Sequence, residues 1–397
     1  MNIDRVSVVG LGKLGAPLAV CLAKAGFQVV GNDVNEKFVN ALNKSEAAFF
    51  EPNLDEFLKS FATRLSASTN KQDVIDKSDV TFMIVPTPSE KSGNFSNEYL
   101  ITACEELGKA FRSKNSWHLF VITSTVLPGS MDNVLVPALE KASGKKAGVD
   151  FGVCYSPLFI ALGSVINNIL NPDFTLIGES DERAGATLES IYARVVENGS
   201  KSHRMNYVNA EISKISVNCY VTMKISFANQ IAEICEGLPG ADVDVVTGAV
   251  GSDTRVGKKY LKGALGFGGP CFPRDNRALS YVARKAGKPA LLAEATDQMN
   301  DRQVLRVVEK AMVKKPSEVA VLGLAYKPDT PVTEESQGVQ IARLLVSQGV
   351  RVRAYDPLAN ETAKMDLGSS VMFYEDKNQC VQGADVVIIT LPGQKYL

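Results

Sequence analysis

The chain has 397 residues, of which 45% are hydrophobic and 22% are charged, and its formal net charge is −1. At ~100–200 residues per domain, this length predicts two or three globular domains. The near-neutral charge does not favour nucleic acid or a membrane surface as a partner, so an anionic ligand has to be bound by local groups. The longest apolar stretches are far shorter than the ~20 residues of a membrane-spanning helix.

The seven cysteines and two histidines limit the possible chemistry. None of the cysteines forms a Cys-x-x-Cys pair, which argues against a disulfide framework and against a zinc site. With so few histidines, a His-based metal site or a Ser-His-Asp triad is not expected. We therefore predict no metal.

The N-terminal region alternates short apolar runs with helical patterns. Because its first strand begins almost at once, without the regions of a signal peptide, we expect a cytoplasmic protein. Strands are expected at Val6–Val9, Val29–Asn32, Val80–Val85 and Leu119–Thr123, and helices at Leu14–Ala25, Asn97–Phe111 and Met131–Ala142. Near-continuous Val/Ile runs separated by helices predict a parallel sheet covered on both faces. This α/β region continues through Phe174–Gly178, and we predict a Rossmann domain over residues 1–205.

The middle of the chain is helical. Residues 206–236 contain no strong helix breaker, and about thirty residues at a rise of ~1.5 Å form a rod of ~45 Å. Rods of this length often join domains or build subunit interfaces. Further helices are expected at Val243–Val250, Asp275–Ala286 and Ala290–Lys314. We predict that residues 206–300 form a helical dimerisation domain that includes a cysteine loop.

The strand and helix alternation returns near the C-terminus. Strands are expected at Val319–Leu322, Val352–Tyr355 and Val386–Thr390, with a helix at Gly338–Gln348. Residues 301–397 therefore form a second Rossmann-like domain in this prediction. Because the sequence ends just after a strand, we expect that further elements of this domain follow in the complete protein.

The first turn carries the glycine pattern of a dinucleotide site. Gly10 permits a tight turn, Gly12 lets the backbone approach a pyrophosphate, and Gly15 allows close packing of a helix on a strand. Asp33 closes the second strand, where a carboxylate accepts from ribose hydroxyls and repels the extra phosphate of NADP. The pattern predicts NAD, bound by this turn (which includes Leu11, Lys13 and Leu14) and by Asp33, with Pro86, Thr87 and Thr125 contributing at later strand ends.

A glycine-rich segment, LKGALGFGGPCFPRDN at residues 261–276, contains Cys271. So much glycine is poor core material but suits a backbone that wraps closely around a ligand. Cys271 falls near an expected helix start, where the helix end and Arg274 or Lys262 would lower the pKa of its thiol. The alternative is that Cys271 is a buried small hydrophobe, as many free cysteines are.

Lys214 and Asn218 are four residues apart and so share one face of the long helix. Apolar neighbours at Ile212, Ile215 and Cys219 place this face beside apolar surface. A lysine and a carboxamide there suit an oxyanion on a substrate. The alternative is a solvated lysine on a helix surface.

These residues together resemble the UDP-glucose/GDP-mannose dehydrogenase family over essentially the whole chain. The resemblance rests on the motifs GLGKLGAPLA, EPNLDE, STV, AEISKISVN, TRVGKKYLKGALGFGGPCFPRD and GLAYKPDT. It implies two Rossmann-type domains joined by a long dimerising helix. It also implies oxidation of carbon 6 of a nucleotide-diphosphate sugar from alcohol to carboxylate by two NAD, with a UDP-sugar favoured.

The resemblance assigns roles to individual residues. Cys271 holds the aldehyde as a thiohemiacetal and then as a thioester, Lys214 stabilises the oxyanion, Asn218 and Asp275 position oxygen and water, and Thr125 contacts water or cofactor. The expected substrate-binding residues are Phe159, Ile160, Lys214, Asn218, Arg255, Tyr260, Lys262, Phe267, Gly268 and Lys327. Arg255 is expected to reach the site of a neighbouring subunit, which implies a homodimer.

The chain departs from the family pattern at several positions. Leu158 stands where the family usually has a glutamate that helps to hydrolyse the thioester, and Leu162 replaces another acidic or polar group. Glu334 and Glu335 stand where many relatives have an arginine near the cofactor. Either Asp275 takes over as base or hydrolysis is slow or altered. Two alternatives therefore remain, a two-electron alcohol dehydrogenase that releases the aldehyde and a nucleotide-sugar-binding protein with little turnover.

Overall fold

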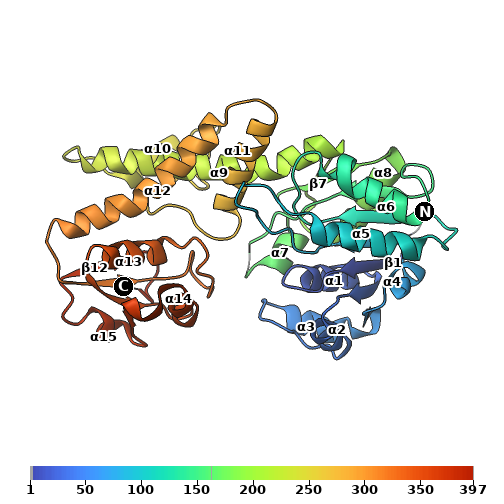
Figure 1. The fold of residues 1–397 in the computed structure, drawn as a ribbon, viewed down its shortest axis with the longest axis horizontal. Helices are drawn as coiled ribbons and strands as arrows, with labels where there is room; N and C mark the ends of the chain where they lie inside the picture. Colours follow the sequence, from blue (N-terminus) through green and yellow to red (C-terminus); the bar gives the residue numbers. More distant parts are fainter. Residues whose placement is uncertain (1–2, 162, 397) are drawn as a thin grey trace. The chain divides into compact units, whose positions relative to one another are not determined.

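The computed structural model describes residues 3–161 and 163–396 and divides between Lys214 and Ile215 into two compact units. Leu162, one of the expected departures from the family, lies outside the described residues. Figure 1 follows the chain through both units, each of which contains its own sheet.

The first unit is built on an eight-stranded sheet with the order β3-β2-β1-β4-β5-β6-β7-β8. Its strands are β1 (Arg5–Val9), β2 (Gln28–Asn32), β3 (Leu65–Ser68), β4 (Val80–Met83), β5 (Leu119–Ile122), β6 (Gly152–Tyr155), β7 (Thr175–Glu179) and β8 (Ser202–Met205). The order reverses between β1 and β4, which is the switch point at which dinucleotides bind in folds of this kind.

Helices cover this sheet on both faces, as the sequence predicts. They are α1 (Gly15–Lys24), α2 (Glu36–Asn43), α3 (Leu54–Ser60), α4 (Lys71–Lys77), α5 (Glu98–Phe111), α6 (Val136–Ser143), α7 (Val165–Leu170) and α8 (Glu182–Val195). In β5, Leu119 and Val121 belong to one apolar cluster while Phe120 belongs to another. Alternation along a single strand means that each face of the sheet has its own core.

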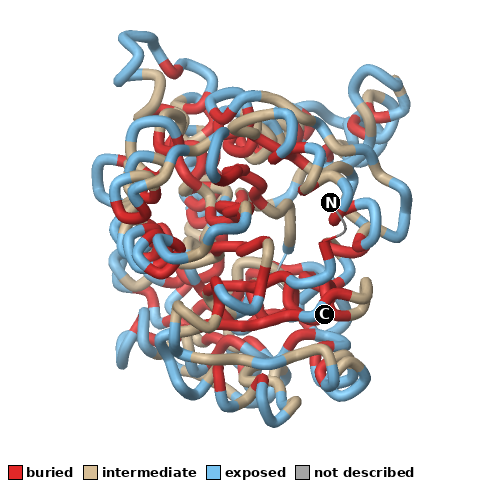
Figure 2. Tube along the Cα trace, turned by 90° about the vertical axis from the view of Figure 1, so that its right-hand side faces the viewer, coloured by how far each residue is buried: buried red, intermediate tan, exposed pale blue. Residues whose placement is uncertain are grey.

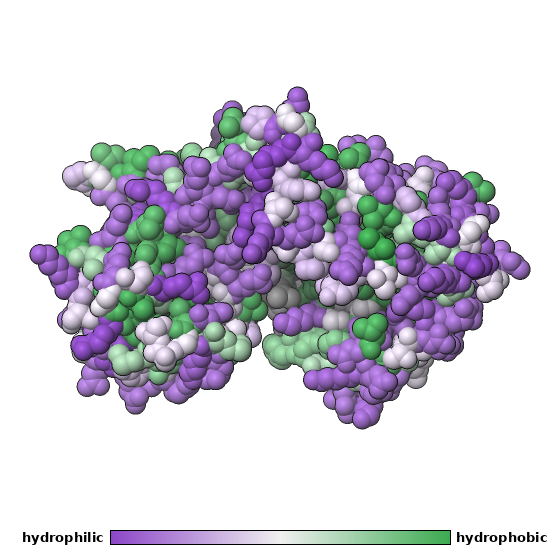
Figure 3. Space-filling model, in the orientation of Figure 1, coloured by the Kyte–Doolittle hydropathy of each residue, from purple (hydrophilic) through white to green (hydrophobic). Residues whose placement is uncertain are grey.

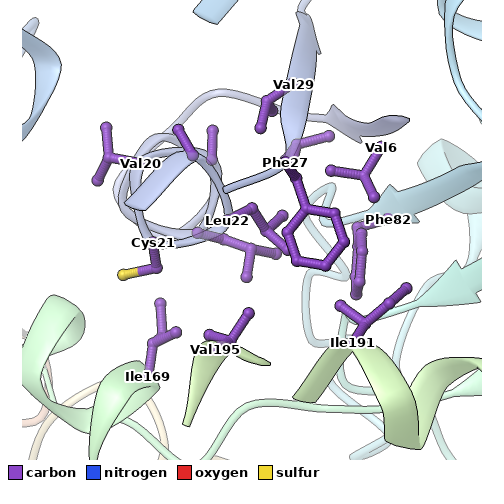
Figure 4. Packing of buried hydrophobic residues seen from close by; sticks show 14 of the residues in the cluster. Val6, Val20, Cys21, Leu22, Phe27, Val29, Phe82, Ile169, Ile191 and Val195 are labelled. Carbon is purple, nitrogen blue, oxygen red and sulfur yellow. The ribbon is translucent and has the colours of Figure 1, made fainter. Parts of the chain in front are cut away.

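The core beside α1 packs side chains from several elements around one ring (Figure 4). Phe27, which precedes β2, lies beside Leu22 of α1, Phe82 of β4 and Ile191 of α8, and all four residues are at most 1% exposed. In Figure 2 the buried segments lie inside the units and exposed turns surround them. This packing fixes the position of α1, and therefore of the glycine turn that precedes it.

The second unit contains a four-stranded, fully parallel sheet with the order β11-β10-β9-β12. Its strands are β9 (Glu318–Leu322), β10 (Arg351–Tyr355), β11 (Val371–Phe373) and β12 (Val386–Ile389), and its packed helices are α13 (Gln337–Ser347), α14 (Asn360–Leu367) and α15 (Lys377–Val381). The same unit includes the helical region of α10 (Val243–Val250), α11 (Phe272–Lys285) and α12 (Leu291–Met312). The fold class is therefore α/β with two Rossmann-like sheets, as predicted.

Helix α9 (Tyr207–Glu236) is an unbroken helix of 30 residues that runs from the first unit into the second. Its length confirms the rod expected from the sequence. Over the described residues, no helix combines the length and the apolar character that crossing a bilayer requires.

The structure corrects several expected elements. β7 runs antiparallel to β6, because the chain returns into β7 from the edge of the sheet at which β6 ends. The helix expected from Met131 starts with a π-helical stretch, Met131–Leu135, before α6. Helix α11 begins at Phe272, three residues earlier than expected, so Cys271 becomes its N-cap residue.

Candidate active site

The turn between β1 and α1 has the geometry of a dinucleotide site. Gly10 has a φ of +95°, and a Cβ on Gly15 would lie 1.7 Å from the carbonyl oxygen of Gly10. A Cβ on Gly12 would meet no atom within 4 Å, so the backbone is open to a ligand there. Leu14 is the N-cap of α1 and its side chain makes no capping hydrogen bond. The helix amides therefore face the turn, where they would bind the pyrophosphate of NAD.

Asp33 is fixed beside this turn. Its Oδ2 accepts a hydrogen bond from the backbone N–H of Leu11 at 2.7 Å, and its Oδ1 accepts from the N–H of Asn35 at 2.8 Å. The carboxylate is only partly buried, so it still offers acceptor capacity at the end of β2. This arrangement fits the ribose of NAD.

Hydroxyl groups join the strand ends next to the switch point. Thr87 Oγ1 donates to the carbonyl oxygen of Thr125 at 2.8 Å, and Ser124 Oγ donates to that of Val85 at 2.6 Å. These bonds tie the segments after β4 and β5 together. Thr125 and the exposed Pro86 thus lie at the carboxyl edge of the sheet, as the sequence predicts.

Glu211 is a buried carboxylate that sequence reasoning missed. It lies on α9, is 0% exposed, and accepts hydrogen bonds from the N–H groups of Gly129 and Met131 at 2.7 and 2.8 Å. Burial raises the pKa of Glu211 to about 7. The carboxylate ties the segment after Thr125 to the helix of Lys214. Its sequence signal is weak, because Glu211 shares its helix face with the polar residues Lys214 and Asn218.

Lys214 is buried rather than solvated. Its side chain is 7% exposed, and Nζ donates to the carbonyl oxygen of Leu158 at 2.6 Å and lies 4.3 Å from the centroid of the Phe159 ring. The Leu158 and Ile160 side chains pack against the core beside α1. Position 158 therefore contributes a carbonyl oxygen to Lys214 and an apolar side chain to the core.

In the second unit, Cys271 caps the N-terminus of α11. All seven cysteines lie in the described part of the chain, and only Cys271 is exposed. The alternative of a buried, inert thiol is therefore excluded. The carbonyl oxygen of Cys271 accepts the N–H of Asp275 at 2.9 Å, which forms the first turn of α11.

Asp275 lies beside α9 and is 3% exposed. Its Oδ2 accepts a hydrogen bond from Asn218 Nδ2 at 2.6 Å, and its carbonyl oxygen accepts the Cys219 thiol at 3.4 Å. Asn218 and Asp275, predicted to act together, are thus in direct contact. The second unit brings these two residues to the helix start that Cys271 caps.

Other expected substrate residues lie in the second unit. Phe267 and Gly268 are buried, whereas Lys262 and Tyr260 are exposed, and the Tyr260 ring lies 6.3 Å from that of Phe272. Arg255 pairs with Asp253 at 2.7 Å and keeps 87% of its side chain exposed. Lys327 is half-buried, with Nζ 5.7 Å from the centroid of the Tyr326 ring.

The glycines before Cys271 pack against protein. A Cβ on Gly266 would lie 2.3 Å from Asn300 Oδ1, one on Gly268 would lie 2.3 Å from the carbonyl oxygen of Glu335, and one on Gly269 would lie 2.4 Å from the Tyr326 ring. The expectation from sequence was that these glycines serve close approach to a ligand. In the structure they let the loop lie against its own unit.

Three consecutive parts of the chain match one enzyme family. Residues 4–196 match the NAD binding domain of the UDP-glucose/GDP-mannose dehydrogenase family, residues 208–302 match its central domain, and residues 320–397 match its UDP binding domain. The chain belongs to this family.

Individual members are similar along nearly the whole chain. The UDP-glucose 6-dehydrogenase of Haloferax volcanii is 34% identical over 99% of this chain and 92% of its own length. The GDP-mannose 6-dehydrogenase of Pseudomonas syringae pv. tomato is 35% identical with the same coverage. A solved UDP-glucose dehydrogenase from Pyrobaculum islandicum superimposes with a TM-score of 0.92 at 35% identity and covers 100% of this chain and 91% of that one.

Family membership confirms the resemblance seen in the sequence. The protein is an NAD-dependent oxidoreductase of nucleotide sugars. The open glycine turn and Asp33 are consistent with that cofactor.

Proposed function

We propose that this protein oxidises carbon 6 of a UDP-sugar from alcohol to carboxylate, with Cys271 as its covalent nucleophile. The observation that carries the proposal is the exposed Cys271 at the N-cap position of α11, one helical turn before the Asp275–Asn218 pair. Bound NAD accepts one hydride in each of two oxidations. A helix N-terminus favours the thiolate, which is the reactive form of cysteine.

The first oxidation converts the primary alcohol into an aldehyde. In our proposal the hydroxyl proton passes to a base and the carbon gives up a hydride. The Cys271 thiolate then adds to the aldehyde carbon, a C–S bond forms, and the electron pair of the carbonyl moves to oxygen. Lys214 stabilises that oxygen, since its ammonium is held by the Leu158 carbonyl on a part of α9 that is largely shielded from water.

The thiohemiacetal solves a physical problem of the second oxidation. A free aldehyde would diffuse away or hydrate, whereas the covalent adduct stays attached to Cys271. Loss of a second hydride from the same carbon gives a thioester. Water then adds to the carbonyl carbon, the C–S bond breaks, and the thiolate leaves as the carboxylate is released. In total, one alcohol, one water and two NAD give one carboxylate, two NADH and three protons.

We assign the activation of water to Asp275. Leu158 replaces the usual acidic residue and packs its side chain against the core, so it has no proton acceptor to offer in that role. Asp275 is a buried carboxylate whose Oδ2 is oriented by Asn218 Nδ2 at 2.6 Å. Thr125 is proposed to contact water or the cofactor from the neighbouring strand end.

We propose that the cofactor is held by two groups of residues. The turn residues Gly10, Leu11, Gly12, Lys13, Leu14 and Gly15 bind the pyrophosphate with backbone amides, and Asp33 binds the ribose. Pro86, Thr87 and Thr125 complete the site at the strand ends. The carboxylate of Asp33 disfavours the additional phosphate of NADP.

The residues proposed to bind the UDP-sugar are those that the family resemblance indicates. They are Phe159, Ile160, Lys214, Asn218, Tyr260, Lys262, Phe267, Gly268 and Lys327. A UDP-sugar is favoured over a GDP-sugar because residues 320–397 match a UDP binding domain. The boundaries 1–205, 206–300 and 301–397 describe the cofactor, helical and nucleotide-sugar domains in this proposal.

We further propose that the protein is a homodimer with Arg255 reaching the site of the partner. Tyr220, Phe227 and Ile234, spaced seven residues apart on α9, are 56%, 49% and 48% exposed. Val245 on α10 is 70% exposed, and Figure 3 shows apolar surface over α10. Exposed apolar stripes of this kind suit a second helix pair.

We also propose a cytoplasmic location, which fits seven cysteines that form no disulfide.

The proposal is tested by measuring NADH formation with a panel of UDP- and GDP-linked hexoses. We expect a UDP-sugar to give the highest kcat/KM and Cys271→Ser to form no acid from it. Preference for a GDP-sugar would contradict the nucleotide assignment alone. Binding by calorimetry without NADH from any sugar would reject the enzymatic proposal.

Sedimentation of Phe227→Lys tests the dimer, because a charge in the stripe is expected to yield monomers.

A further inference from the structure

The backbone of the loop that leads to Cys271 forms hydrogen bonds with side chains from other elements. Residues 264–269 belong to no helix or strand, and Phe267, Gly268 and Gly269 are buried. Buried backbone N–H and C=O groups require hydrogen bonds. The partners are largely carboxamide side chains from three helices of the same unit.

Each carboxamide serves both a donor and an acceptor of the loop. Asn229 of α9 accepts the N–H of Ala264 at 2.9 Å and donates to the carbonyl oxygen of Leu265 at 3.1 Å. Gln337 of α13 accepts the N–H of Gly266 at 3.2 Å and approaches the carbonyl oxygen of Phe267 at 3.5 Å. A carboxamide presents a donor and an acceptor side by side, much as a neighbouring strand does.

Asn300 of α12 makes the most complete of these pairings. Its Oδ1 accepts the N–H of Phe267 at 2.7 Å, and its Nδ2 donates to the carbonyl oxygen of the same residue at 3.0 Å. Asn300 is 8% exposed, so water competes little for these bonds. Both polar groups of one loop residue are therefore satisfied by one side chain.

The chain between Phe267 and Cys271 has little freedom to absorb a displacement. The N–H of Gly269 donates to the carbonyl oxygen of Glu334 at 2.9 Å. Gly268 and Gly269 lie directly against Glu335 and Tyr326, and a Cβ on either would overlap protein atoms. A shift at Phe267 is thus transmitted to the N-cap position of α11, which Cys271 occupies.

We infer that Asn300 is a positioning residue for the reaction: it fixes the backbone of Phe267 and thereby holds Cys271 at the N-terminus of α11. The inference rests on the proposed role of Cys271. Asn229 and Gln337 support the same loop on either side. Asn300 does not touch the reacting atoms in this account and acts only through the loop.

The matched experiment compares Asn300→Asp with Gln303→Glu. Both replace an amide with an acid on α12. Gln303 is also buried, at 0% exposed against 8% for Asn300, but its Nε2 donates to Met299 and Glu233 and not to the loop. We expect both variants to lower the melting temperature. In Asn300→Asp an oxygen faces the carbonyl of Phe267, so kcat is expected to fall ~10²-fold, as misplaced reacting groups do, while KM for NAD stays the same.

Alkylation by iodoacetamide provides a readout that needs no substrate. Because the other six cysteines are buried, modification of the folded protein reports Cys271. Moving the thiol away from the helix end is expected to slow its alkylation roughly two- to fivefold in Asn300→Asp but not in Gln303→Glu. Amide exchange in residues 264–269 is expected to accelerate in the first variant alone.

The inference is overturned if Asn300→Asp and Gln303→Glu have the same kcat and the same alkylation rate. If Asn300→Asp does not fold, Gln337→Glu replaces it, with effects in the same direction and smaller. A wild-type protein that forms no NADH from any nucleotide sugar would refute the proposed function. The alkylation and exchange rates would still decide whether Asn300 holds Cys271.

Discussion

Each unit contains a connection from a strand to a helix that is bounded by two glycines, and the two connections differ in length and in what their backbone binds. Each follows the first strand of its sheet, β1 or β9, and each begins with a glycine of positive φ, +95° at Gly10 and +104° at Gly323. A second glycine lies in the first turn of the following helix, Gly15 in α1 and Gly338 in α13. A Cβ on Gly15 would lie 1.7 Å from the carbonyl oxygen of Gly10, and a Cβ on Gly338 would lie 2.1 Å from that of Gly323. Both helix starts therefore pack directly on the preceding turn.

What separates the two turns is how their backbone is used. The first has residues 11–14 between its glycines, is open at Gly12, and has a partly exposed Asp33 beside it. The second has residues 324–337 there, and Asp356, which follows β10, is 2% exposed. Asp356 accepts from the N–H groups of Leu324, Ala325, Leu358 and Ala359. The same acidic position is available to a ligand in one unit and is fully engaged by protein in the other.

The largest effects are expected from Gly15→Ala and Gly338→Ala. Each added Cβ would overlap a backbone carbonyl oxygen, so each variant is expected to lower the free energy of unfolding of its own unit by about 3 kcal/mol, the upper end of the usual cost of overpacking. Amide exchange followed by mass spectrometry would locate the loss. If both variants accelerate amide exchange in the same unit, the claim that each glycine stabilises its own unit is wrong.

Asp33→Asn and Asp356→Asn are expected to separate ligand binding from stability. In Asp356→Asn an amide group faces two backbone N–H donors, which is expected to cost about 3 kcal/mol of unfolding free energy. Asp33→Asn places its amide group against only one backbone N–H donor at a partly exposed site, so it is expected to lower the melting temperature less than Asp356→Asn does and to raise KM for NAD. The comparison fails if Asp356→Asn keeps wild-type stability.

Glu211 is a second carboxylate, besides Asp356, whose oxygens are occupied by backbone N–H groups of the protein. Its folded pKa is raised from 4.5 to about 7, so the stability it contributes is present below pH 4.5 and is lost as the pH rises through about 7. At about 1.4 kcal/mol per pH unit, a pKa difference of about 2.5 units limits this loss of unfolding free energy to at most about 3.5 kcal/mol. Glu211→Gln should remove this part of the pH dependence. If the melting temperatures of the wild-type protein and Glu211→Gln change equally with pH from 5 to 8, the assignment of this pH dependence to Glu211 is wrong.

The smallest change is expected for Gly12→Ala. A Cβ at this position meets no protein atom within 4 Å, so stability is expected to stay the same. The methyl group would instead obstruct the pyrophosphate and raise KM for NAD about tenfold, which corresponds to about 1.4 kcal/mol. A fall in melting temperature without a change in KM would mean that the turn at Gly12 is closed by protein.

The elements with strong apolar patterns could be predicted from sequence. β1, β2, β5, α9 and α10 begin and end within one residue of their expected positions. The edge strands β3 and β8 were missed because their sequences, LSAS and SHRM, are short and contain no Val, Ile or aromatic residue. β11 has only three residues, and β6, with the sequence GVCY, begins with glycine and lacks the run of strongly apolar residues found in β5.

The site was predictable where chemistry is encoded locally. The glycine turn, Asp33, Cys271 and the Lys214–Asn218 spacing are all short-range patterns. The bond from Lys214 to the Leu158 carbonyl and the pairing of Asn300 with Phe267 join positions far apart in the sequence. Because every residue type has the same backbone carbonyl group, these bonds cannot be predicted from the sequence and are seen only in the structure.

The central claim is that Cys271 retains the aldehyde until it is oxidised again. Its most direct test is the amount of NADH formed when a limiting, known amount of the preferred nucleotide sugar is consumed completely. The account predicts two NADH per sugar, a uronic acid as product, and no acid from Cys271→Ser. One NADH per sugar with free aldehyde as the product would contradict it.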